Sequence, residues 1–397
     1  MTLQPILIAG GGIGGLATAL GLSRFGIPAI VFEKARAFGE IGAGIQLGPN
    51  AFHAFDYLGV GREARRTAVY IEALRLMDAL KGEEITHIPL DAPFRERFGN
   101  PYAVVHRGDL HKVLLDACRA SDIVDLRPAS EVVDYDQDGA SVTVTLASGD
   151  RVTGRALVGA DGLWSRVRGK VVGDGAPRVS GHTTYRSVIP TEQMPEDLRW
   201  NAATLWAGPK CHAVHYPLSG WKLFNLVVTY HNDAPEPVAG QPVEKAEVAR
   251  GFAHTHERVR SIIEHGNDWK LWVLCDRDPV DNWVDGRVAL LGDAAHPMLQ
   301  YAAQGACMAM EDAVALAHMM DDHGGDVEPA FEAYRQARVV RTARVQLVSR
   351  FLGEHVYHPA GAHAAVRDSM IKSKSTDQLY DAIAWLYGGR AVDGAAA

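Results

Sequence analysis

The start of the chain combines short apolar runs with a helical apolar pattern. Ile6–Ala9 is a continuous apolar run that ends in glycines, and Ala29–Phe32 is a second such run. Between them, Leu16, Ala19 and Leu20 recur at helical spacing. A strand, a helix and a strand within about thirty residues have the size of a parallel βαβ crossover. This pattern predicts a doubly wound α/β fold.

Three later segments extend this prediction. Residues 130–155 alternate polar and apolar positions around a turn at 137–139, which is typical of an antiparallel β-meander. Residues 179–281 contain strand-like segments rich in Tyr, Trp, Val and Thr, and they indicate an inserted sheet domain. A buried strand returns at residues 288–291 and leads into a long helix, so we expect the first domain to be interrupted and resumed.

The composition is that of an ordinary globular chain, with 47% apolar and 22% charged residues. A formal charge of -8 argues against nucleic acid or an anionic membrane as the main partner. No apolar run reaches the roughly 20 residues that span a bilayer. Residues 1–12 lack the basic and apolar regions of a secretory signal, so we expect a cytoplasmic protein.

Three groups of residues receive structural interpretations. The cysteines lack metal-ligand spacing, so we expect reduced thiols and no metal site; they are Cys118, Cys211, Cys275 and Cys307. Arginines at near-helical spacing within residues 334–350 predict a solvated helix, because the acidic total disfavours a nucleic-acid face. Residues 379–387 are apolar enough to dock on the body of the protein or on a second subunit, which leaves a homodimer open.

A glycine motif lies at the turn between the first strand and the first helix. Gly10, Gly12 and Gly15 have the GxGxxG spacing that brings a pyrophosphate close to a helix N-terminus. Glu33 closes the second strand, where a carboxylate accepts hydrogen bonds from a ribose diol. The other expected contacts are Ile13, Gly14 and Lys34. The motif predicts a dinucleotide site, but NAD-dependent dehydrogenases share it, so it does not identify the dinucleotide.

Two later motifs distinguish these alternatives. Residues 159–162 (Gly-Ala-Asp-Gly) and 292–297 (Gly-Asp-Ala-Ala-His-Pro) follow buried strands, where ligands gather in open α/β sheets. With three motifs in this order, residues 4–350 resemble the class A flavoprotein aromatic hydroxylases of the salicylate and para-hydroxybenzoate hydroxylase type. The resemblance implies an α/β fold with a Rossmann-like FAD-binding domain, made of a parallel sheet and a β-meander. It further implies an inserted mixed β-sheet substrate domain and C-terminal helices.

The expected boundaries are residues 1–178 and 282–350 for the FAD-binding domain, 179–281 for the substrate domain and 351–397 for the helical tail. The resemblance also implies the reaction. NADH would reduce FAD and leave, and dioxygen would then form a flavin C4a-hydroperoxide that hydroxylates a small aromatic acid.

The resemblance assigns FAD contacts to four residues outside the glycine motif. Asp161 and Asp293 would bind FAD, Arg107 would approach the flavin chain or the pyrophosphate, and the backbone of Val132 would meet adenine. Simpler interpretations stay open, because Asp161 can cap the helix that follows it, Asp293 can end a strand and Arg107 can be a surface cation. Arg166 and Arg168 are expected at the surface or in salt bridges.

The segment after Pro297 leads into a helix whose first amides belong to Gly305 and Ala306. The positive end of this helix would lie where N1 and O2 of a reduced flavin carry negative charge. We expect this arrangement to favour flavin reduction.

The inserted sheet offers a candidate base. His212, Val214 and Tyr216 share one face of a strand, with His215 on the other face. A histidine that titrates near neutral pH suits the removal of a proton from a phenol, whose own pKa is near ~10. Alternatively, His212 is a hydrogen-bonded strand residue and Tyr216 fills the core.

Residues 299–309 look most like those of 3-hydroxybenzoate 6-hydroxylases. By that resemblance Gln300 lies beside the substrate with His212, and the product is gentisate, 2,5-dihydroxybenzoate. Salicylate and 6-hydroxynicotinate stay open as substrates, since related enzymes share the His and Tyr pair. Gln300 can also be a simple loop amide. Two other classes stay open, namely a pyridine-nucleotide dehydrogenase and a non-catalytic flavin-binding protein.

Overall fold

A parallel sheet forms the base of the molecule in this computed structural model, which describes residues 4–39 and 43–389. Its strand order is β19-β20-β12-β1-β2-β8, and all neighbours are parallel except β19 and β20. The strands are β1 Ile6–Ala9, β2 Ala29–Phe32, β8 Val124–Arg127, β12 Ala156–Gly159, β19 Val284–Asp285 and β20 Val288–Leu290. The central strands are continuous apolar runs because both of their faces are buried.

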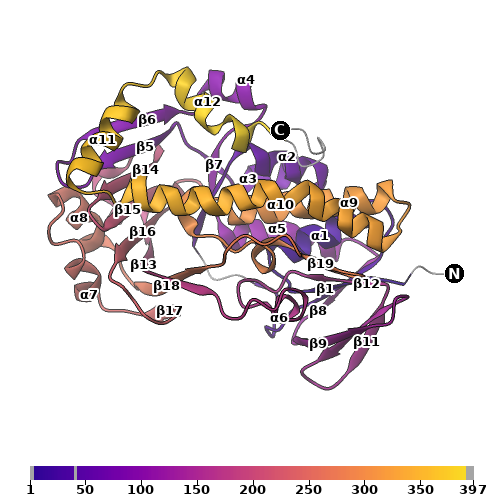
Figure 1. Cartoon of the computed structure of the whole chain (residues 1–397). Helices are drawn as coiled ribbons and strands as arrows, with labels where there is room; N and C mark the ends of the chain where they lie inside the picture. Colours follow the sequence, from indigo (N-terminus) through magenta and orange to yellow (C-terminus); the bar gives the residue numbers. More distant parts are fainter. Residues whose placement is uncertain (1–3, 40–42, 390–397) are drawn as a thin grey trace.

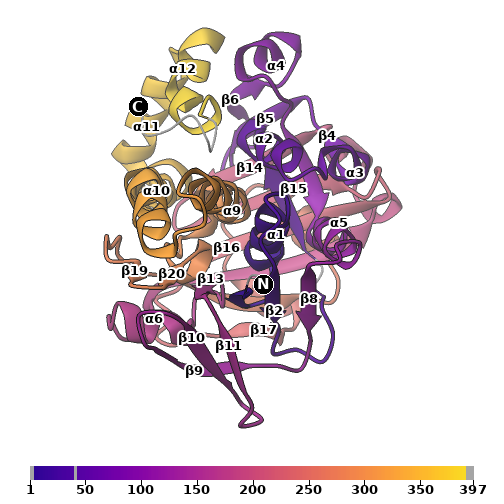
Figure 2. The same ribbon diagram turned by 90° about the vertical axis from the view of Figure 1, so that its right-hand side faces the viewer.

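Helices cover this sheet and connect its strands. In Figure 1 the long helices α9 and α10 run side by side across the molecule, and Figure 2 shows them beside α1 and α5. The helices of this half are α1 Ile13–Ser23, α2 Pro49–Tyr57, α3 Gly61–Thr67, α5 Arg107–Arg119, α6 Arg166–Val171, α9 Gly305–Asp322 and α10 Val327–Phe351. The short helix α4 Ala92–Phe98 lies apart from them, at the top of both views (Figures 1 and 2). The expected strand, helix and strand unit at the start of the chain is confirmed as β1, α1 and β2.

Two small antiparallel sheets complete this half. One is the expected meander of β9 Val132–Gln137, β10 Val142–Leu146 and β11 Arg151–Gly154, which projects from the lower end of the molecule in both views (Figures 1 and 2). The other joins β3 Gly44–Leu47, β7 Ala103–His106 and β4 Val69–Tyr70.

A large sheet of eight strands stands opposite the parallel sheet, with the order β17-β18-β13-β16-β15-β14-β5-β6. Its strands are β5 Ala73–Asp78, β6 Glu84–Pro89, β13 Arg178–Pro190, β14 Ala202–Gly208, β15 Cys211–Leu218, β16 Leu223–His231, β17 Ala239–Pro242 and β18 Lys270–Asp276. The helices α7 Lys245–Arg250 and α8 Glu257–His265 pack apolar side chains against one of its faces.

This sheet is not confined to the expected residues 179–281. The hairpin β5–β6 completes its edge, because β5 pairs in parallel with β14 from Ala202↔Ala73 to Ala207↔Asp78. The sequence interpretation missed this contribution, since the paired segments lie more than a hundred residues apart in the chain and neither carries a local signal for the other.

The C-terminal segment continues α10 through a π-helical turn, Leu352–Tyr357, into α11 Gly361–Lys372 and α12 Thr376–Tyr387. Edge-to-face aromatic contacts hold α12 against α4, since Tyr380 and Tyr387 contact Phe94 and Phe98. The apolar segment 379–387 therefore docks on its own chain. Residues 1–3 and 390–397, which the expected domains include, lie outside the described residues, as do residues 40–42.

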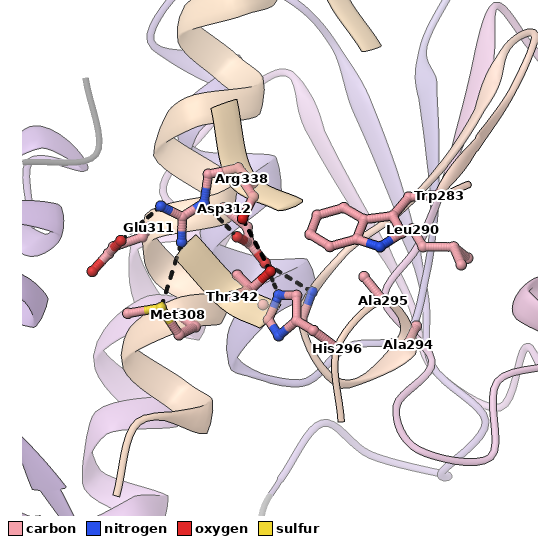
Figure 3. Close-up of polar contacts among 12 residues, drawn as sticks. Trp283, Leu290, Ala294, Ala295, His296, Met308, Glu311, Asp312, Arg338 and Thr342 are labelled. Atoms are coloured by element: carbon pink, nitrogen blue, oxygen red, sulfur yellow. Dashed lines mark hydrogen bonds and ion pairs between the residues drawn. The ribbon is translucent and has the colours of Figure 1, made fainter. Parts of the chain in front are cut away.

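A buried ion network joins α9 and α10, and it corrects the expectation that the arginines of residues 334–350 lie on a solvated helix. Arg338 is 2% exposed. Its guanidinium donates to Asp312 over 2.8 Å and to Glu311 over 2.7 Å, as Figure 3 shows. Arg341 also binds Glu311, over 2.6 Å. The arginines do lie on a helix at the expected spacing, but one face of that helix packs against buried carboxylates.

The second carboxylate of this network reaches the loop after β20. Asp312 accepts hydrogen bonds from the backbone N–H of Gly292 and from Nε2 of His296 (Figure 3). Burial alone would raise the pKa of Asp312, but the charges of His296 and Arg338 outweigh it and hold this pKa at about 2. The network therefore ties the loop 292–297 to both long helices.

We predict that Arg338→Ala costs about 3–5 kcal/mol of unfolding free energy, because it removes the cation that two buried carboxylates share. Arg335→Ala is the matched control on the same helix. Arg335 pairs with the half-exposed Glu332, so the control should cost less than about 1 kcal/mol. Urea titrations followed by circular dichroism measure both values. Equal losses in the two variants would contradict the network's structural role.

Candidate active site

The glycine turn between β1 and α1 has two positions where neighbouring backbone comes too close for any side chain. Gly10 has a φ of +107°, and a Cβ there would lie 2.3 Å from the carbonyl oxygen of Ala160. A Cβ on Gly15 would lie 1.9 Å from the carbonyl oxygen of Gly10. Gly10, Gly12, Ile13 and Gly14 line a large cavity, whereas Gly15 lies behind them and lets α1 pack against the turn.

Glu33 lies at the same cavity with its carboxylate held in place. Its oxygens accept hydrogen bonds from the backbone N–H of Gly11 over 2.9 Å and from that of Ala35 over 2.8 Å. Lys34 also lines the cavity. Hydrogen bonding uses one lone pair of each oxygen, so the carboxylate keeps acceptor capacity for a ribose diol.

Asp161 combines the two interpretations that the sequence left open. Its carboxylate accepts the N–H groups of Arg166 and Val167 and the hydroxyl of Ser165, so it caps α6. It also lines the cavity, and burial raises its pKa against these hydrogen bonds. The neighbouring Arg168 is buried in an ion pair with Asp174, as the salt-bridge expectation proposed.

Asp293 projects from a short turn, Gly292–Ala294, into the cavity. Protein surrounds this carboxylate, although the cavity leaves it accessible, and burial raises its pKa while His296 and Arg107 oppose that shift. Arg107, Val132, Gly305 and Ala306 line the same cavity. The chain thus brings to one space every residue expected to contact the cofactor except Gly15.

The cavity has a volume of about 1140 Å³ and extends from the glycine turn to the large sheet. Drug-sized ligands occupy sites of roughly 300–1,000 Å³. The space therefore fits a dinucleotide together with a second, small molecule.

The large sheet forms the floor at the far end of the cavity. Cross-strand neighbours Arg186, Val227, Val214, Leu205 and Leu76 form one row that lines it. A second row of cross-strand neighbours lies beside the first and contains Thr184, Thr229 and His212. Side chains at these positions share a face because residues two apart along a strand point the same way.

His212 and Tyr216 both line this floor, and both are 2% exposed. Nδ1 of His212 lies 2.7 Å from Nε2 of His358. Burial, with smaller contributions from His358 and His182, holds the pKa of His212 well below its usual value. The expected titration near neutral pH is therefore wrong for this environment, and the ring is neutral before it accepts a proton. Burial raises the pKa of Tyr216.

His215 faces away from the cavity, as the alternation along the strand predicts. Its ring packs among Trp200, Trp206 and Phe224. It is fully buried, and burial lowers its pKa to about 3. This histidine belongs to the core behind the sheet.

Gln300 connects the loop after Pro297 to the floor. Its Oε1 accepts from Arg186 over 2.9 Å, and its Nε2 donates to the hydroxyls of Thr184 over 2.7 Å and Thr229 over 3.1 Å. The amide is thus oriented by the sheet, and both of its N–H groups are used within the protein.

Arg186 is a site residue that the sequence interpretation missed. Its guanidinium lines the cavity, and burial lowers its pKa. Among the described residues no carboxylate pairs with it, and its Nε is buried without a hydrogen-bond partner. The available signal was an arginine at the cavity-facing position of β13, between the inward-facing Thr184 and Val188.

The C-terminal helices also line the cavity, which no sequence pattern indicated. The π-helical turn contributes Val356 and Tyr357, α11 contributes Ile371, and α12 contributes Leu386 and Tyr387. The tail therefore forms part of the wall that separates the floor from water.

Comparison with known proteins identifies this geometry. A family model described as an FAD binding domain matches residues 4–345. The chain belongs to this FAD-binding family. Over 390 residues it is 55% identical to 3-hydroxybenzoate 6-hydroxylase 1 of Aquipseudomonas alcaligenes, an alignment that covers 98% of each chain.

Two solved structures share the fold. HpxO of Klebsiella pneumoniae, complexed with FAD and uric acid, has a TM-score of 0.84 and 26% identity and covers 97% of each chain. A salicylate hydroxylase substrate complex has a TM-score of 0.82 and 25% identity and covers 98% of this chain and 96% of its own. The expected fold class and the resemblance to class A flavoprotein aromatic hydroxylases are confirmed.

FAD is the cofactor of this family, and the residues present fit it. The glycine turn, where a Cβ would fill the space beside Gly10 and Gly15, leaves its backbone amides open to the pyrophosphate. The carboxylate of Glu33 suits the ribose, and Asp293 suits hydroxyl groups of the chain that carries the flavin. The N-terminus of α9 at Gly305 offers a positive helix end to the ring system.

We predict that Gly15→Ala weakens FAD binding by at least about tenfold, which corresponds to 1.4 kcal/mol, because α1 must move away from the turn. Gly169→Ala in α6 is the matched control, since a Cβ there meets nothing within 4 Å. Fluorescence titration of the apoprotein with FAD measures both affinities. Wild-type affinity in Gly15→Ala would show that the close approach does not matter.

Proposed function

We propose that this enzyme hydroxylates 3-hydroxybenzoate para to its hydroxyl group to give gentisate, with NADH and O2 as co-substrates. The observation that carries the proposal is 55% identity to a 3-hydroxybenzoate 6-hydroxylase along 98% of both chains. The balanced reaction consumes the aromatic acid, NADH, O2 and a proton, and it yields gentisate, NAD⁺ and water. Bound FAD supplies the redox chemistry, taking a hydride from NADH and activating oxygen.

The protein's own part is to ionise and orient the ring. We propose that Nε2 of His212 accepts the phenol proton, because its Nδ1 is already engaged with His358. A phenolate carries more electron density at the para carbon, which makes that carbon a better nucleophile. Gln300 would exchange one of the two threonine partners of its Nε2 for the phenolate oxygen and donate to it, and Tyr216 would pack beside the ring on the floor.

Arg186 supports an aromatic acid as the substrate class. A guanidinium that faces a protein-lined cavity without a carboxylate partner is costly, and a carboxylate ligand offsets that cost through charge-assisted hydrogen bonds. Arg186 and His212 occupy adjacent rows of one sheet face. We therefore propose that Arg186 binds the carboxylate while His212 and Gln300 bind the hydroxyl of the same ring.

Two wider expectations remain proposals. The four thiols are unpaired, which supports work in the reducing cytoplasm. No helix of the described chain is long and apolar enough to cross a membrane. A homodimer is supported by the exposed apolar side chains of Val340, Leu347 and Phe351 along α10.

The proposed function predicts a specific substrate response. Holoenzyme supplied with NADH and O2 is tested with 3-hydroxybenzoate, salicylate, 6-hydroxynicotinate and 3-hydroxybenzyl alcohol. We expect rapid NADH oxidation only with 3-hydroxybenzoate. Chromatography with mass detection should find gentisate from 3-hydroxybenzoate in near-equal amounts to the NADH consumed. A different hydroxylated product, or a preference for salicylate or 6-hydroxynicotinate, would contradict the assignment. No aromatic stimulation at all would indicate a non-catalytic flavin-binding protein.

We predict that Arg186→Met raises the KM for 3-hydroxybenzoate about 100-fold, because a buried charge pair that loses one partner costs about 2–5 kcal/mol. Arg178→Met is the control, since Arg178 lies on the same strand but is half exposed and pairs with Asp276. Steady-state kinetics at saturating NADH measure both variants. An unchanged KM in Arg186→Met would remove the carboxylate role from this residue.

A further inference from the structure

Four histidines form a row that leads away from the cavity floor. His212 contacts His358 through ring nitrogens 2.7 Å apart. The ring centroids of His358 and His182 lie 5.2 Å apart, and those of His182 and His231 lie 4.2 Å apart. The rings come from β15, from the end of the π-helical turn, from β13 and from β16. Segments distant in sequence therefore converge on this row.

Solvent exposure increases along the row. His212 is 2% exposed and His358 is 9% exposed. At the far end the side chain of His231 is 33% exposed, and its Nε2 lies 3.2 Å from Oδ1 of Asp233, whose side chain is 77% exposed. The row thus connects the buried floor of the cavity with the surface.

The row does not resemble a metal site. Within residues 4–39 and 43–389, no group of three or more His, Cys, Asp or Glu side chains is arranged to hold a metal ion. The contacts instead run from one ring to the next, and Tyr301 packs against the rings of His182, His212 and His358. Its hydroxyl contacts Nδ1 of His182.

The contact between His212 and His358 constrains where their protons lie. A hydrogen bond between two neutral imidazoles needs one protonated and one free nitrogen. If Nε2 of His212 is free to accept a proton, its Nδ1 carries the hydrogen and donates to Nε2 of His358. His358 then carries its own hydrogen on Nδ1, which is buried without a hydrogen-bond partner. This N–H is a proton ready to leave toward His182.

We propose that His358, His182 and His231 carry to solvent the proton that His212 takes from the substrate, a role that rests on the proposed function. The phenol O–H bond breaks and an N–H bond forms at Nε2 of His212. The proton on Nδ1 of His212 moves to Nε2 of His358, and the proton on Nδ1 of His358 leaves toward His182. Because the hydroxyl of Tyr301 holds Nδ1 of His182, this hydroxyl takes up the incoming proton and passes its own to Nδ1 of His182. The proton on Nε2 of His182 then leaves toward His231. A proton then passes from His231 to water. Each ring again holds one proton, and the substrate remains as a phenolate.

The environment of the rings favours onward transfer over storage. Burial, with a smaller contribution from neighbouring histidines, lowers the pKa of His358 to about 3 and that of His182 to about 4. A buried imidazolium at these positions is unstable at neutral pH, so a phenolate forms only if the proton moves on. The ring separation between His358 and His182 is one that a small ring rotation or a bridging water spans.

Proton release during substrate binding tests this relay. Oxidised holoenzyme is mixed in a stopped-flow instrument with 3-hydroxybenzoate, without NADH, in weak buffer that contains a pH indicator dye. FAD absorbance reports binding and the dye reports the proton. We expect His358→Gln to slow proton release at least about tenfold while the dissociation constant from FAD absorbance stays within about threefold of wild type. His265→Gln is the control, because His265 is an exposed residue of α8 that bonds only its own helix.

The glutamine variant separates a relay from a structural role. Its amide can accept the hydrogen bond from His212 but cannot pass a proton on. Wild-type release in His358→Gln would overturn the relay and leave His358 as a positioning residue. Should that variant fail to hold FAD, His231→Gln at the half-exposed end gives the same test, and an unchanged rate there would also overturn the relay. Wild-type enzyme that binds the acid without releasing a proton overturns the relay alone, whereas an absent FAD response overturns the proposed function as well.

Discussion

The structure depends on one buried carboxylate, that of Asp312. It accepts hydrogen bonds from the backbone N–H of Gly292, from the ring of His296 and from the guanidinium of Arg338. These bonds connect the loop after β20 with α9 and α10. Charges inside a protein are tolerated only when they are paired and hydrogen-bonded, so the loop and the two helices can be arranged in few other ways. The loop that it holds presents Asp293 to the cavity and leads to the N-terminus of α9. The segment that binds FAD is thus held in position by the charged hydrogen bonds of Asp312.

The site itself lies between two sheets with different tasks. The parallel sheet ends in the glycine turn, Asp161 and Asp293, which suit the long, hydroxyl-rich and phosphate-bearing part of FAD. The large sheet offers a floor on which Arg186, His212 and Gln300 are fixed by strand register and hydrogen bonds. The C-terminal helices close the side of the cavity. Excluding water strengthens the polar interactions inside and protects reactive states of a flavin from side reactions.

Local motifs made the cofactor half predictable from sequence. Gly10, Gly15 and Glu33 lie within one βαβ unit, and their spacing reflects contacts made over a few ångströms. The floor was only partly predictable. The alternation around His212 gave the correct face of its strand, but Arg186 and His358 reach the site from β13 and from the end of the π-helical turn, which only tertiary structure brings near.

Other differences also arise from tertiary context. Arginines at helical spacing look alike whether their helix meets water or the carboxylates of Glu311 and Asp312, so the burial of Arg338 was not visible in the chain. The pKa of His212 was expected near neutrality because a sequence does not reveal how deeply a ring is buried. The parallel pairing of β5 with β14 likewise depends on the whole fold.

The central claim is that one cavity holds a flavin and a hydroxybenzoate in a fixed mutual orientation. A crystal structure of the oxidised holoenzyme with 3-hydroxybenzoate tests it most directly. The account predicts the carboxylate on Arg186, the hydroxyl oxygen within hydrogen-bond distance of Nε2 of His212, and the para carbon toward the flavin. A ring bound in the reverse orientation, or outside this cavity, would contradict it.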